Sequence, residues 1–471
     1  MDVPGSIKLD KGAASPLYLQ LAEYILGAIE NGHIAAYEKL PSIRRLSKNL
    51  GVNSSTVVAA YKHLENKQVL YSHVGKGTFV SGRADLNNSA SLNLKMDSVF
   101  FDFKNAVNFA KSTVSTEFFP VSAFKDAFLK VLDRDSGEAF SYHEVMGYPP
   151  LRNEICKNLL KHGITAEPNE IQVISGVGAG LDIISGALIC PGDVIVMENP
   201  ALYSNMGSLH SKGARIVAVD METDGMDMVK LESVLKSHTV RFICISSYFQ
   251  TPTGYCYSEQ KKQKLLELAC KYSAYIIEED SYSEPGFYNN MPLPIKALDY
   301  NERVLFVKSY GKSVLPGINL TVLVTPGKLI AADLLVSEIP NGFIQRAYEL
   351  FLASGEYDKH MENMRQLFKT RLNVALHCIN EKLSDYVKYT SPPVGLSIWL
   401  KLRDENISVE VLSQKLLNEN VIITPGALYH MESKDIPYFR LSLAGVSEKD
   451  IEFGINKIAD CMQKITEERL S

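Results

Sequence analysis

The strongest constraint on the fold is an alternation of short apolar runs with longer helical stretches. Seven runs rich in β-branched residues recur along the chain: IQVIS (171–175), VIVME (194–198), RIVAVD (215–220), FICISS (242–247), AYIIEED (274–280), VLFVKS (304–309) and TVLVTP (321–326). Strands that alternate with helices imply a mostly parallel sheet with helices on both faces. Ligands of such α/β sheets bind beyond the carboxyl ends of the strands, so we expect the functional residues in the segments that follow these runs.

Length and charge indicate a separate head on this body. A chain of 471 residues exceeds what one hydrophobic core usually serves, which favours two or more domains. The net charge is −5, yet between Lys39 and Val80 the only acid is Glu65 and the basic residues number seven. A basic head on an acidic body indicates that any contact with DNA is confined to the head.

The basic head has the pattern of three helices. Pro16 can begin a first helix that Asn31-Gly32 ends, Ser42–Leu50 forms a second that stops at Gly51, and Asn53–Glu65 forms a third. The apolar faces of the first and third helices are expected to form the core: Leu21, Ile25, Ala28 and Ile29, with Val57, Ala60, Tyr61 and Leu64. Two short helices joined by a turn predict a helix-turn-helix.

A small hairpin follows these helices. Val69–Ser72 and Thr78–Val80 read as strands on either side of a turn at Val74–Gly77, which completes a winged helix-turn-helix. In such domains the exposed face of the third helix enters the major groove, and glycines of the wing let backbone amides approach phosphate. The alternative is a winged helix that serves protein contacts.

The segments LPSIRRLSKNLGVNSSTVVAAYKHLENKQVL (40–70) and GKGTFV (75–80) resemble the DNA-binding domain of GntR-type regulators. The resemblance implies DNA contacts from Ser42, Arg44, Arg45, Ser54, Ser55, Thr56, Tyr61, Lys62, Gly75, Lys76 and Gly77. Many members carry an arginine early in the recognition helix, where this chain has Ser54 and Ser55. We therefore expect base reading that is weaker or rests on hydroxyls, with phosphate contacts from Arg44, Arg45 and Lys76.

A connector separates the head from the sheet. Ser81–Lys95 is rich in Ser, Asn and Gly and has little periodicity, which is typical of a flexible linker. We expect a DNA-binding domain at residues 1–80, a linker at 81–100 and an effector-binding domain at 101–471.

Several segments of the large domain carry residue types that suit chemistry at a sheet end. The small residues of Ser175–Gly180 would let backbone amides and a helix N-terminus cradle a phosphate, although close strand–helix packing needs glycine too. Tyr248–Tyr255 forms a turn after a strand, and Glu278–Tyr282 places acids at a strand end. Lys312, in a Ser/Gly-rich turn, could form a Schiff base with an aldehyde. Arg440, between apolar strand residues, suits a carboxylate ligand or a structural ion pair.

In this order the segments resemble the fold-type I aminotransferases across about Phe103–Leu470. The resemblance includes GYPPLRNEI (147–155), PGDVIVMENP (191–200), PTG (252–254), Lys312 and FRLSLA (439–444). A GntR-type head before such a body is the architecture of the MocR subfamily of regulators. It implies an α/β domain with a mostly parallel sheet and a small C-terminal α+β subdomain, and pyridoxal 5'-phosphate as cofactor.

The resemblance also implies roles for individual residues. Lys312 would hold the cofactor, Glu279 or Asp280 would face the ring nitrogen, Tyr282 would bond the ring hydroxyl and Tyr203 would stack on the ring. The phosphate would be held by Gly176, Val177, Gly178 and Ser309, with Asn319 in the place of a usual ligand. Arg440 would bind the carboxylate of an effector.

This chain departs from the family at the site itself. Glu279 replaces an aspartate, and Asp280 could replace it only if the register shifts, because neighbouring strand residues face opposite sides. The other departures are Thr251 for the asparagine of NPTG, Gly311 for a serine, Asn319 for an arginine and Leu202 in the place of the stacking tyrosine. We expect weaker cofactor binding than in the enzymes, and the departures argue against efficient transamination.

The leading hypothesis is a DNA-binding transcription regulator that binds pyridoxal phosphate and an amino acid as effector. The alternatives are a pyridoxal-phosphate-dependent aminotransferase with a DNA-binding head, and a degenerate binding module without cofactor. The resemblance implies a head-to-tail homodimer on double-stranded operator DNA. The seven cysteines are scattered without zinc spacing, and we find no signal peptide or membrane span, so we expect a cytoplasmic protein without a metal site.

Overall fold

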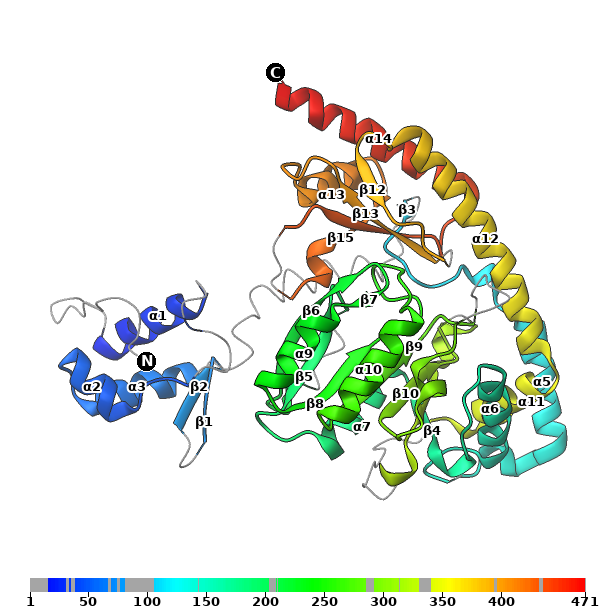
Figure 1. Cartoon of the computed structure of the whole chain (residues 1–471), viewed down its shortest axis with the longest axis horizontal. Coiled ribbons are helices and arrows are strands. Elements are labelled where there is room, and N and C mark those ends of the chain that lie inside the picture. The colour runs from blue at the N-terminus through cyan, green and yellow to red at the C-terminus, as the bar shows by residue number, and fades with distance from the viewer. Residues whose placement is uncertain are drawn as a thin grey trace. The chain divides into compact units, whose positions relative to one another are not determined.

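The computed structural model describes residues 16–30, 34, 39–66, 69–73, 77–80, 106–142, 144–202, 209, 211–284, 292–312, 314–329, 340–393, 396–431 and 435–470. The chain divides into two compact units, Met1–Phe100 and Phe101–Ser471 (Figure 1). Each unit has its own core. The expected linker at 81–100 lies outside the described residues.

The N-terminal unit is the predicted winged helix-turn-helix. It contains α1 (Leu17–Glu30), α2 (Ile43–Leu50) and α3 (Ser54–Asn66), followed by the antiparallel strands β1 (Leu70–His73) and β2 (Gly77–Val80). Ser42 caps α2 by accepting a hydrogen bond from the Arg45 backbone N–H at 3.3 Å, and Gly51 ends the helix in the left-handed conformation. The apolar faces predicted for α1 and α3 are buried in one core.

The C-terminal unit is built on an eight-stranded sheet. Its strands are β4 (Ile171–Ser175), β5 (Val194–Asn199), β6 (Arg215–Glu222), β7 (Gly225–Met226), β8 (Val240–Ile245), β9 (Tyr275–Asp280), β10 (Val304–Ser309) and β11 (Leu320–Val324). The spatial order is β4-β11-β10-β9-β8-β5-β6-β7. Strands β6, β5, β8, β9 and β10 are parallel, whereas β11 is antiparallel to both β10 and β4, and β7 is antiparallel to β6. The prediction of a mostly parallel sheet is confirmed.

Helices cover both faces of this sheet, as predicted. Helix α7 (Val177–Leu188) packs on one face against Ile277, Val307 and their neighbours. The opposite face is covered by α5 (Val121–Asp135), α6 (Pro149–Lys161), α9 (Met228–Ser237), α10 (Glu259–Lys271) and α11 (Gly342–Ala353). Because side chains alternate along a strand, odd-numbered residues of β9 and β10 face α7 and even-numbered residues face α6 and α10.

A small α+β subdomain completes the unit, as predicted. Its antiparallel sheet has the order β12 (Val387–Tyr389), β13 (Ser397–Leu402), β16 (Tyr438–Ser442), β15 (Thr424–Pro425). Helices α13 (Val409–Asn418) and α14 (Glu448–Leu470) pack beside it, and β14 (Val421–Ile422) pairs with β3 (Val107–Asn108). The long helix α12 (Glu356–Lys382) runs between α11 and this subdomain (Figure 1). Among the described helices, none is long and apolar enough to cross a membrane.

Candidate functional site

Lys312 lies beyond the carboxyl end of β10, where it meets the acid that the strand alternation brings to the same side. Its Nζ donates a hydrogen bond to Ser281 Oγ at 2.9 Å and lies 3.3 Å from Glu279 Oε1. Ser281 Oγ in turn donates to Glu279 Oε1 at 2.7 Å. The same ammonium is 5.6 Å from the centre of the Tyr282 ring. Burial lowers the pKa of Lys312, but the charge of Glu279, the smaller effects of Tyr282 and Asp280, and the hydrogen bond to Glu279 together leave this pKa above its ordinary value.

The phosphate cradle predicted at Ser175–Gly180 has the local structure that an anion site needs. Gly176 is the N-cap of α7 with φ 94°, and the first turn of the helix begins at Val177. A Cβ placed on Gly178 would meet nothing within 4 Å, so space is open above its backbone. The N-terminus of a 12-residue helix offers unpaired amides and a positive dipole end to an anion.

Asn319 borders this cradle. Its Nδ2 donates to the Ser175 carbonyl oxygen at 3.1 Å, and a Cβ on Gly176 would lie only 2.7 Å from Asn319 Oδ1. The backbone of Asn319 is left-handed, with φ 51°, a conformation that asparagine adopts more readily than most residues. Ser309 is buried and accepts from the Lys312 backbone N–H at 3.4 Å. The structure thus brings Asn319, Gly176 and the turn that carries Lys312 together.

Arg440 on β16 is a buried guanidinium without a carboxylate partner among the residues that the structure describes. It is 4% exposed, and its Nη1 donates to Ser112 Oγ at 3.1 Å and to Tyr429 Oη at 3.4 Å. Its Nε has no hydrogen-bond partner there. A buried charge is stable when paired, so this arrangement calls for an anionic ligand.

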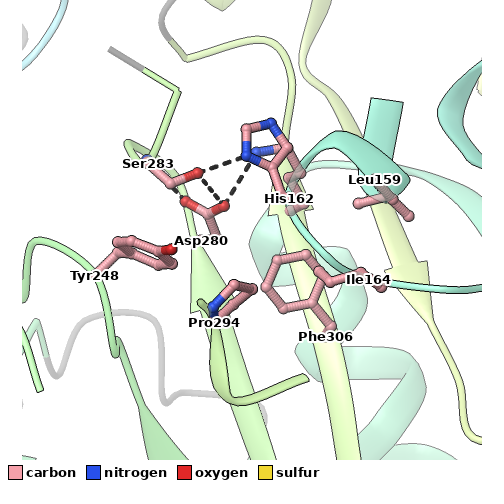
Figure 2. Close-up of a pocket in the computed structure, with 9 residues that line it drawn as sticks. Leu159, His162, Ile164, Tyr248, Asp280, Ser283, Pro294 and Phe306 are labelled. Atoms are coloured by element: carbon pink, nitrogen blue, oxygen red, sulfur yellow. Dashed lines mark hydrogen bonds and ion pairs between the residues drawn. The ribbon is translucent and has the colours of Figure 1, made fainter. Parts of the chain in front are cut away.

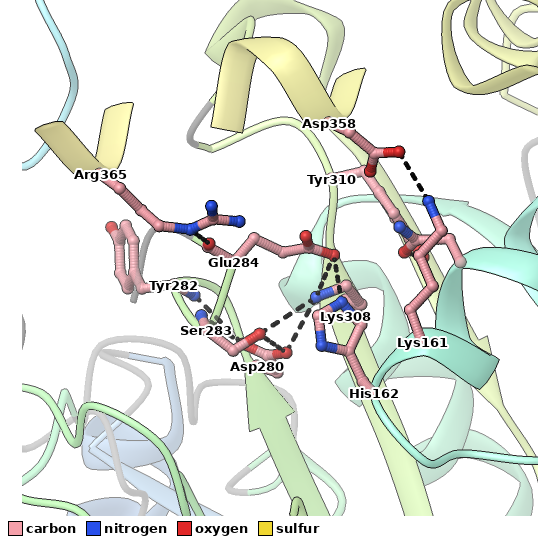
Figure 3. A network of polar contacts seen from close by, with 11 residues as sticks. Lys161, His162, Asp280, Tyr282, Ser283, Glu284, Lys308, Tyr310, Asp358 and Arg365 are labelled. Atoms are coloured by element: carbon pink, nitrogen blue, oxygen red, sulfur yellow. Dashed lines mark hydrogen bonds and ion pairs between the residues drawn. The ribbon is translucent and has the colours of Figure 1, made fainter. Parts of the chain in front are cut away.

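Asp280 lies on the opposite face of the sheet, in a closed charge cluster (Figures 2 and 3). The buried Lys308 Nζ is 3.0 Å from Asp280 Oδ2, 3.2 Å from Glu284 Oε1 and 3.2 Å from Ser283 Oγ. His162 Nε2 lies 3.2 Å from the same oxygen of Glu284. Burial raises the pKa of both carboxyl groups, but the charge of Lys308 and the hydrogen bonds from Lys308, Ser283 and His162 together lower the pKa of each.

A small pocket beside this cluster has room for about one water molecule (Figure 2). Leu159, Tyr248 and Phe306 close it on the apolar side.

Two acids were proposed to face the ring nitrogen. The structure places Glu279 beside Lys312 and Asp280 beside Lys308 on the other face of the sheet, as strand alternation requires.

In the N-terminal unit the structure corrects one proposed DNA contact. Tyr61 is 4% exposed, and its hydroxyl donates to the Pro41 carbonyl oxygen at 2.8 Å, so it belongs to the core. The helical period had already assigned Tyr61 to the inner face, which rules out a role on the outer one. Arg44, Arg45, Ser55 and Lys62 are exposed, as a DNA contact requires.

The remaining proposed residues have varied positions. Ser54 is exposed but shares a hydrogen bond with Ser47 at 3.2 Å, and Thr56 is half-buried. Ser42 is committed to the cap of α2, and Gly77 begins β2. Tyr203, Gly75 and Lys76 lie outside the described residues.

Three residues near the site were not predicted. Ser281 has the same parity as Glu279 in the segment Glu278–Tyr282, so strand alternation could have identified it. Tyr429 lies 11 residues before Arg440, whereas Ser112 reaches it from a distant part of the chain. No local sequence pattern could have indicated the contact with Ser112.

Comparison with known proteins agrees with both units. The family described as bacterial regulatory proteins of the gntR family matches residues 17–80, and the aminotransferase class I and II family matches residues 104–458. The chain is 27% identical to the uncharacterized HTH-type transcriptional regulator YdfD of Bacillus subtilis, covering 97% of this chain and 98% of that protein. It is 26% identical to the probable rhizopine catabolism regulatory protein MocR of Rhizobium meliloti, covering 96% and 94% respectively.

Among solved structures, the kynurenine aminotransferase of Pyrococcus horikoshii, in complex with PMP, matches with a TM-score of 0.73 and 25% identity. The match covers 79% of this chain and 94% of that one. The aromatic-amino-acid aminotransferase 1 of Thermococcus litoralis is 27% identical over 76% of this chain and 88% of its own length. The chain therefore belongs to the aminotransferase class I and II family, and the gntR-family domain in front of that unit gives it the organisation of the MocR-type regulators.

Proposed function

We propose that the chain is a DNA-binding transcription regulator whose aminotransferase-like unit holds pyridoxal phosphate on Lys312 and takes an amino acid as effector. One observation carries the proposal: Lys312, Glu279 and the N-terminus of α7 lie together at the carboxyl ends of the strands. Ligands of α/β sheets bind at this place.

The residues present fit the cofactor. The amides of Val177 and Gly178 and the Ser309 hydroxyl would hold the phosphate, because the backbone at Gly178 is open to an approaching ligand. Glu279 would face the ring nitrogen and stabilise a proton there, and the Tyr282 hydroxyl would bond the ring oxygen. When bound, pyridoxal phosphate supplies an aldehyde that links to an amine and a ring that withdraws electrons.

Ser281 gives this site a path for a proton. A lysine reacts as the neutral amine, whereas the charge of Glu279 holds Lys312 as the ammonium. The Ser281 hydroxyl accepts from Lys312 Nζ and donates to Glu279 Oε1, so it connects the donor of the proton to its acceptor. Lys312 can thus pass a proton to Glu279 through Ser281.

Arg440 would bind the carboxylate of the effector. A carboxylate at this guanidinium would supply the negative charge that the described residues do not, and it would accept a hydrogen bond from the unpaired Nε. Ser112 and Tyr429 already hold Nη1, which orients the planar group for its ligand.

The head would bind double-stranded operator DNA through α3 and the wing. Arg44 and Arg45 lie exposed on α2, where they can contact phosphate. The relatives named as regulators match nearly the whole chain, which supports this role. We propose a head-to-tail homodimer that contacts two half-sites, with its cofactor and effector changing the affinity for DNA.

A second candidate, an aminotransferase with a DNA-binding head, is favoured by the presence of both Lys312 and Arg440 and by the similarity to a named aminotransferase. Gly311 and Asn319 count against it, because each removes a polar group that the enzymes keep. Measured amino-group transfer from amino acids to 2-oxo acids would distinguish the two functions.

Borohydride reduction of the protein with pyridoxal phosphate, followed by peptide mass mapping, tests the cofactor site. We expect the adduct on Lys312, with Lys308 as an internal control because its charge cluster keeps it an ammonium. An adduct on another lysine, or none at saturating cofactor, would promote the reading as a binding module without cofactor.

Arg44→Ala tests the DNA site in the full chain. Binding should weaken about equally for operator and random DNA, and the slope of log affinity against log salt should fall by about one. An unchanged slope would place the phosphate contacts elsewhere.

A further inference from the structure

The outward face of α3 consists of the residues that point away from its buried side. Val57, Ala60, Tyr61 and Leu64 are all at most 4% exposed. The residues that point away from them along the helix are Ser54, Ser55, Val58 and Lys62. Val58 is 45% exposed, and it is the only exposed large apolar side chain among the described residues of the N-terminal unit.

The neighbours of Val58 suit contacts other than the reading of a base. The Ser54 hydroxyl already shares a hydrogen bond with Ser47. Lys62 is exposed one turn after Val58 on α3, where its ammonium can contact a phosphate. Exposed Arg44, Arg45 and Lys48 on α2 make the surroundings basic. When these positive charges contact the phosphates of DNA, the apolar Val58 side chain between them faces the bases.

We infer that Val58 contacts the C5-methyl group of a thymine in the major groove and so selects thymine at one position of each half-site. The inference rests on the proposed DNA-binding function and names its specificity. Val58 is the fifth residue of α3, in the N-terminal half of the recognition helix, which contacts base edges in helix-turn-helix domains. The thymine methyl is the apolar group that the major groove displays, and a β-branched side chain matches it without a hydrogen bond.

A lone exposed valine is ordinary on a protein surface, so the argument depends on its position. Valine cannot accept or donate a hydrogen bond, which excludes reading of guanine, adenine or cytosine by their polar edges. Thymine, which displays a methyl group, is therefore the base that this side chain can recognise.

The test starts from sites that the full-length protein selects from a random-sequence DNA library. Each thymine of a selected site is then replaced, one at a time, by deoxyuridine, which removes only the methyl group. With the unaltered protein we expect one position per half-site where the affinity falls about fourfold, the value of one buried methyl group. Fluorescence anisotropy at fixed salt measures it.

Val58→Ala should bind the thymine and deoxyuridine versions of that site equally. Ser55→Ala changes another proposed DNA contact on the same face of α3, so it should lower the affinity for both DNA versions while the fourfold difference between them remains. Because the deoxyuridine series alters the DNA, a series in which no thymine responds would overturn the inference even if Val58→Ala does not fold.

The outcomes separate the inference from the function beneath it. Selection that yields no common sequence would overturn the DNA-binding function together with the inference. A common sequence in which no thymine responds to deoxyuridine, or a response that Val58→Ala retains, would overturn the assignment of Val58 while specific DNA binding stands.

Discussion

Lys308 and Lys312 are four residues apart, yet they lie in opposite environments at the end of the same sheet. Lys308 is 2% exposed and has Asp280 and Glu284 within 3.2 Å. The Lys312 side chain is 36% exposed and has Glu279 at 3.3 Å. The first cation is enclosed by two buried acids, whereas the second is held by one acid and a hydroxyl and stays open to a ligand. Charge matching and enclosure thus distinguish the structural Lys308 from Lys312, the lysine that we propose to react.

The largest expected effect comes from removing the enclosed lysine. Lys308→Met leaves Asp280 and Glu284 buried without their cation and should lower the unfolding free energy by about 3–5 kcal/mol. Lys312→Met is the matched control, and it should cost less than about 1 kcal/mol because its acid is partly exposed. Urea unfolding of both variants at pH 7 without cofactor measures this difference. Equal losses of stability would contradict the distinction between an enclosed Lys308 and an open Lys312.

The difference in stability between wild type and Lys308→Met should depend on pH. The folded-state pKa values of Asp280 and Glu284 are lowered, so their stabilising contribution is present above the ordinary carboxyl range. It is lost as the pH falls through the folded-state values. The stability gap between wild type and Lys308→Met should therefore narrow below about pH 4. A gap that stays constant down to pH 3 would contradict the ion cluster.

Arg440 extends the comparison to a buried arginine that has no acidic partner among the residues that the structure describes. Arg440→Met should weaken binding of the effector by about 10–100-fold, the value of a charge-assisted contact with a carboxylate. Arg403 in the same subdomain bonds the backbone carbonyls of Ser384 and Val387, so Arg403→Met should leave binding unchanged. Thermal-shift screening of the common amino acids finds the effector, and calorimetry measures its affinity. Equal loss in both variants would indicate a structural role for Arg440.

Asn319→Arg tests the open site around Lys312 through its affinity for the cofactor. A guanidinium at the phosphate cradle should tighten cofactor binding by about tenfold. The left-handed backbone at this position favours asparagine, so part of the gain is offset by strain. Spectrophotometric titration with pyridoxal phosphate measures the affinity. Unchanged or weaker binding would show that the side chain does not face the phosphate.

The smallest expected change in stability is that of a variant of Glu198, an acid near the same sheet end, at pH 5. Burial raises its pKa to about 8, more than the hydrogen bonds from Tyr257, Ser246 and Gln250 lower it. The folded state therefore holds the carboxyl proton at pH 5, and Glu198→Gln should change stability there by less than about 1 kcal/mol.

The sign of its pH effect is fixed by the raised pKa. Between the ordinary carboxyl pKa and about 8 the folded state holds the extra proton, so stability falls as pH rises across this window. Glu198→Gln should remove a slope of about 1.4 kcal/mol per pH unit. An unchanged slope in denaturation between pH 5 and 8 would mean that Glu198 is ionised in the folded state.

Local sequence pattern predicted the strands, the three helices of the head and the two faces of the sheet. It predicted the position of Lys312 because a buried strand and a small-residue turn leave few conformations for that segment. The closed cluster around Lys308 was not predicted, because His162 and Glu284 reach it from elements far apart in sequence. Tyr61 shows the converse, since a resemblance assigned it to DNA where the helical period already placed it in the core.

Helix α12 connects the closed cluster around Lys308 with the subdomain that carries Arg440. Arg365 on this helix donates to the Glu284 backbone oxygen near Lys308, and Arg371 donates to the backbone oxygens of Leu443 and Ala444, just after the strand of Arg440. The two arginines are six residues apart on one helix, about 9 Å along its axis. A ligand that moves the subdomain around Arg440 would therefore move the backbone of Glu284 with it, because fewer than two turns of a continuous helix separate the two contacts.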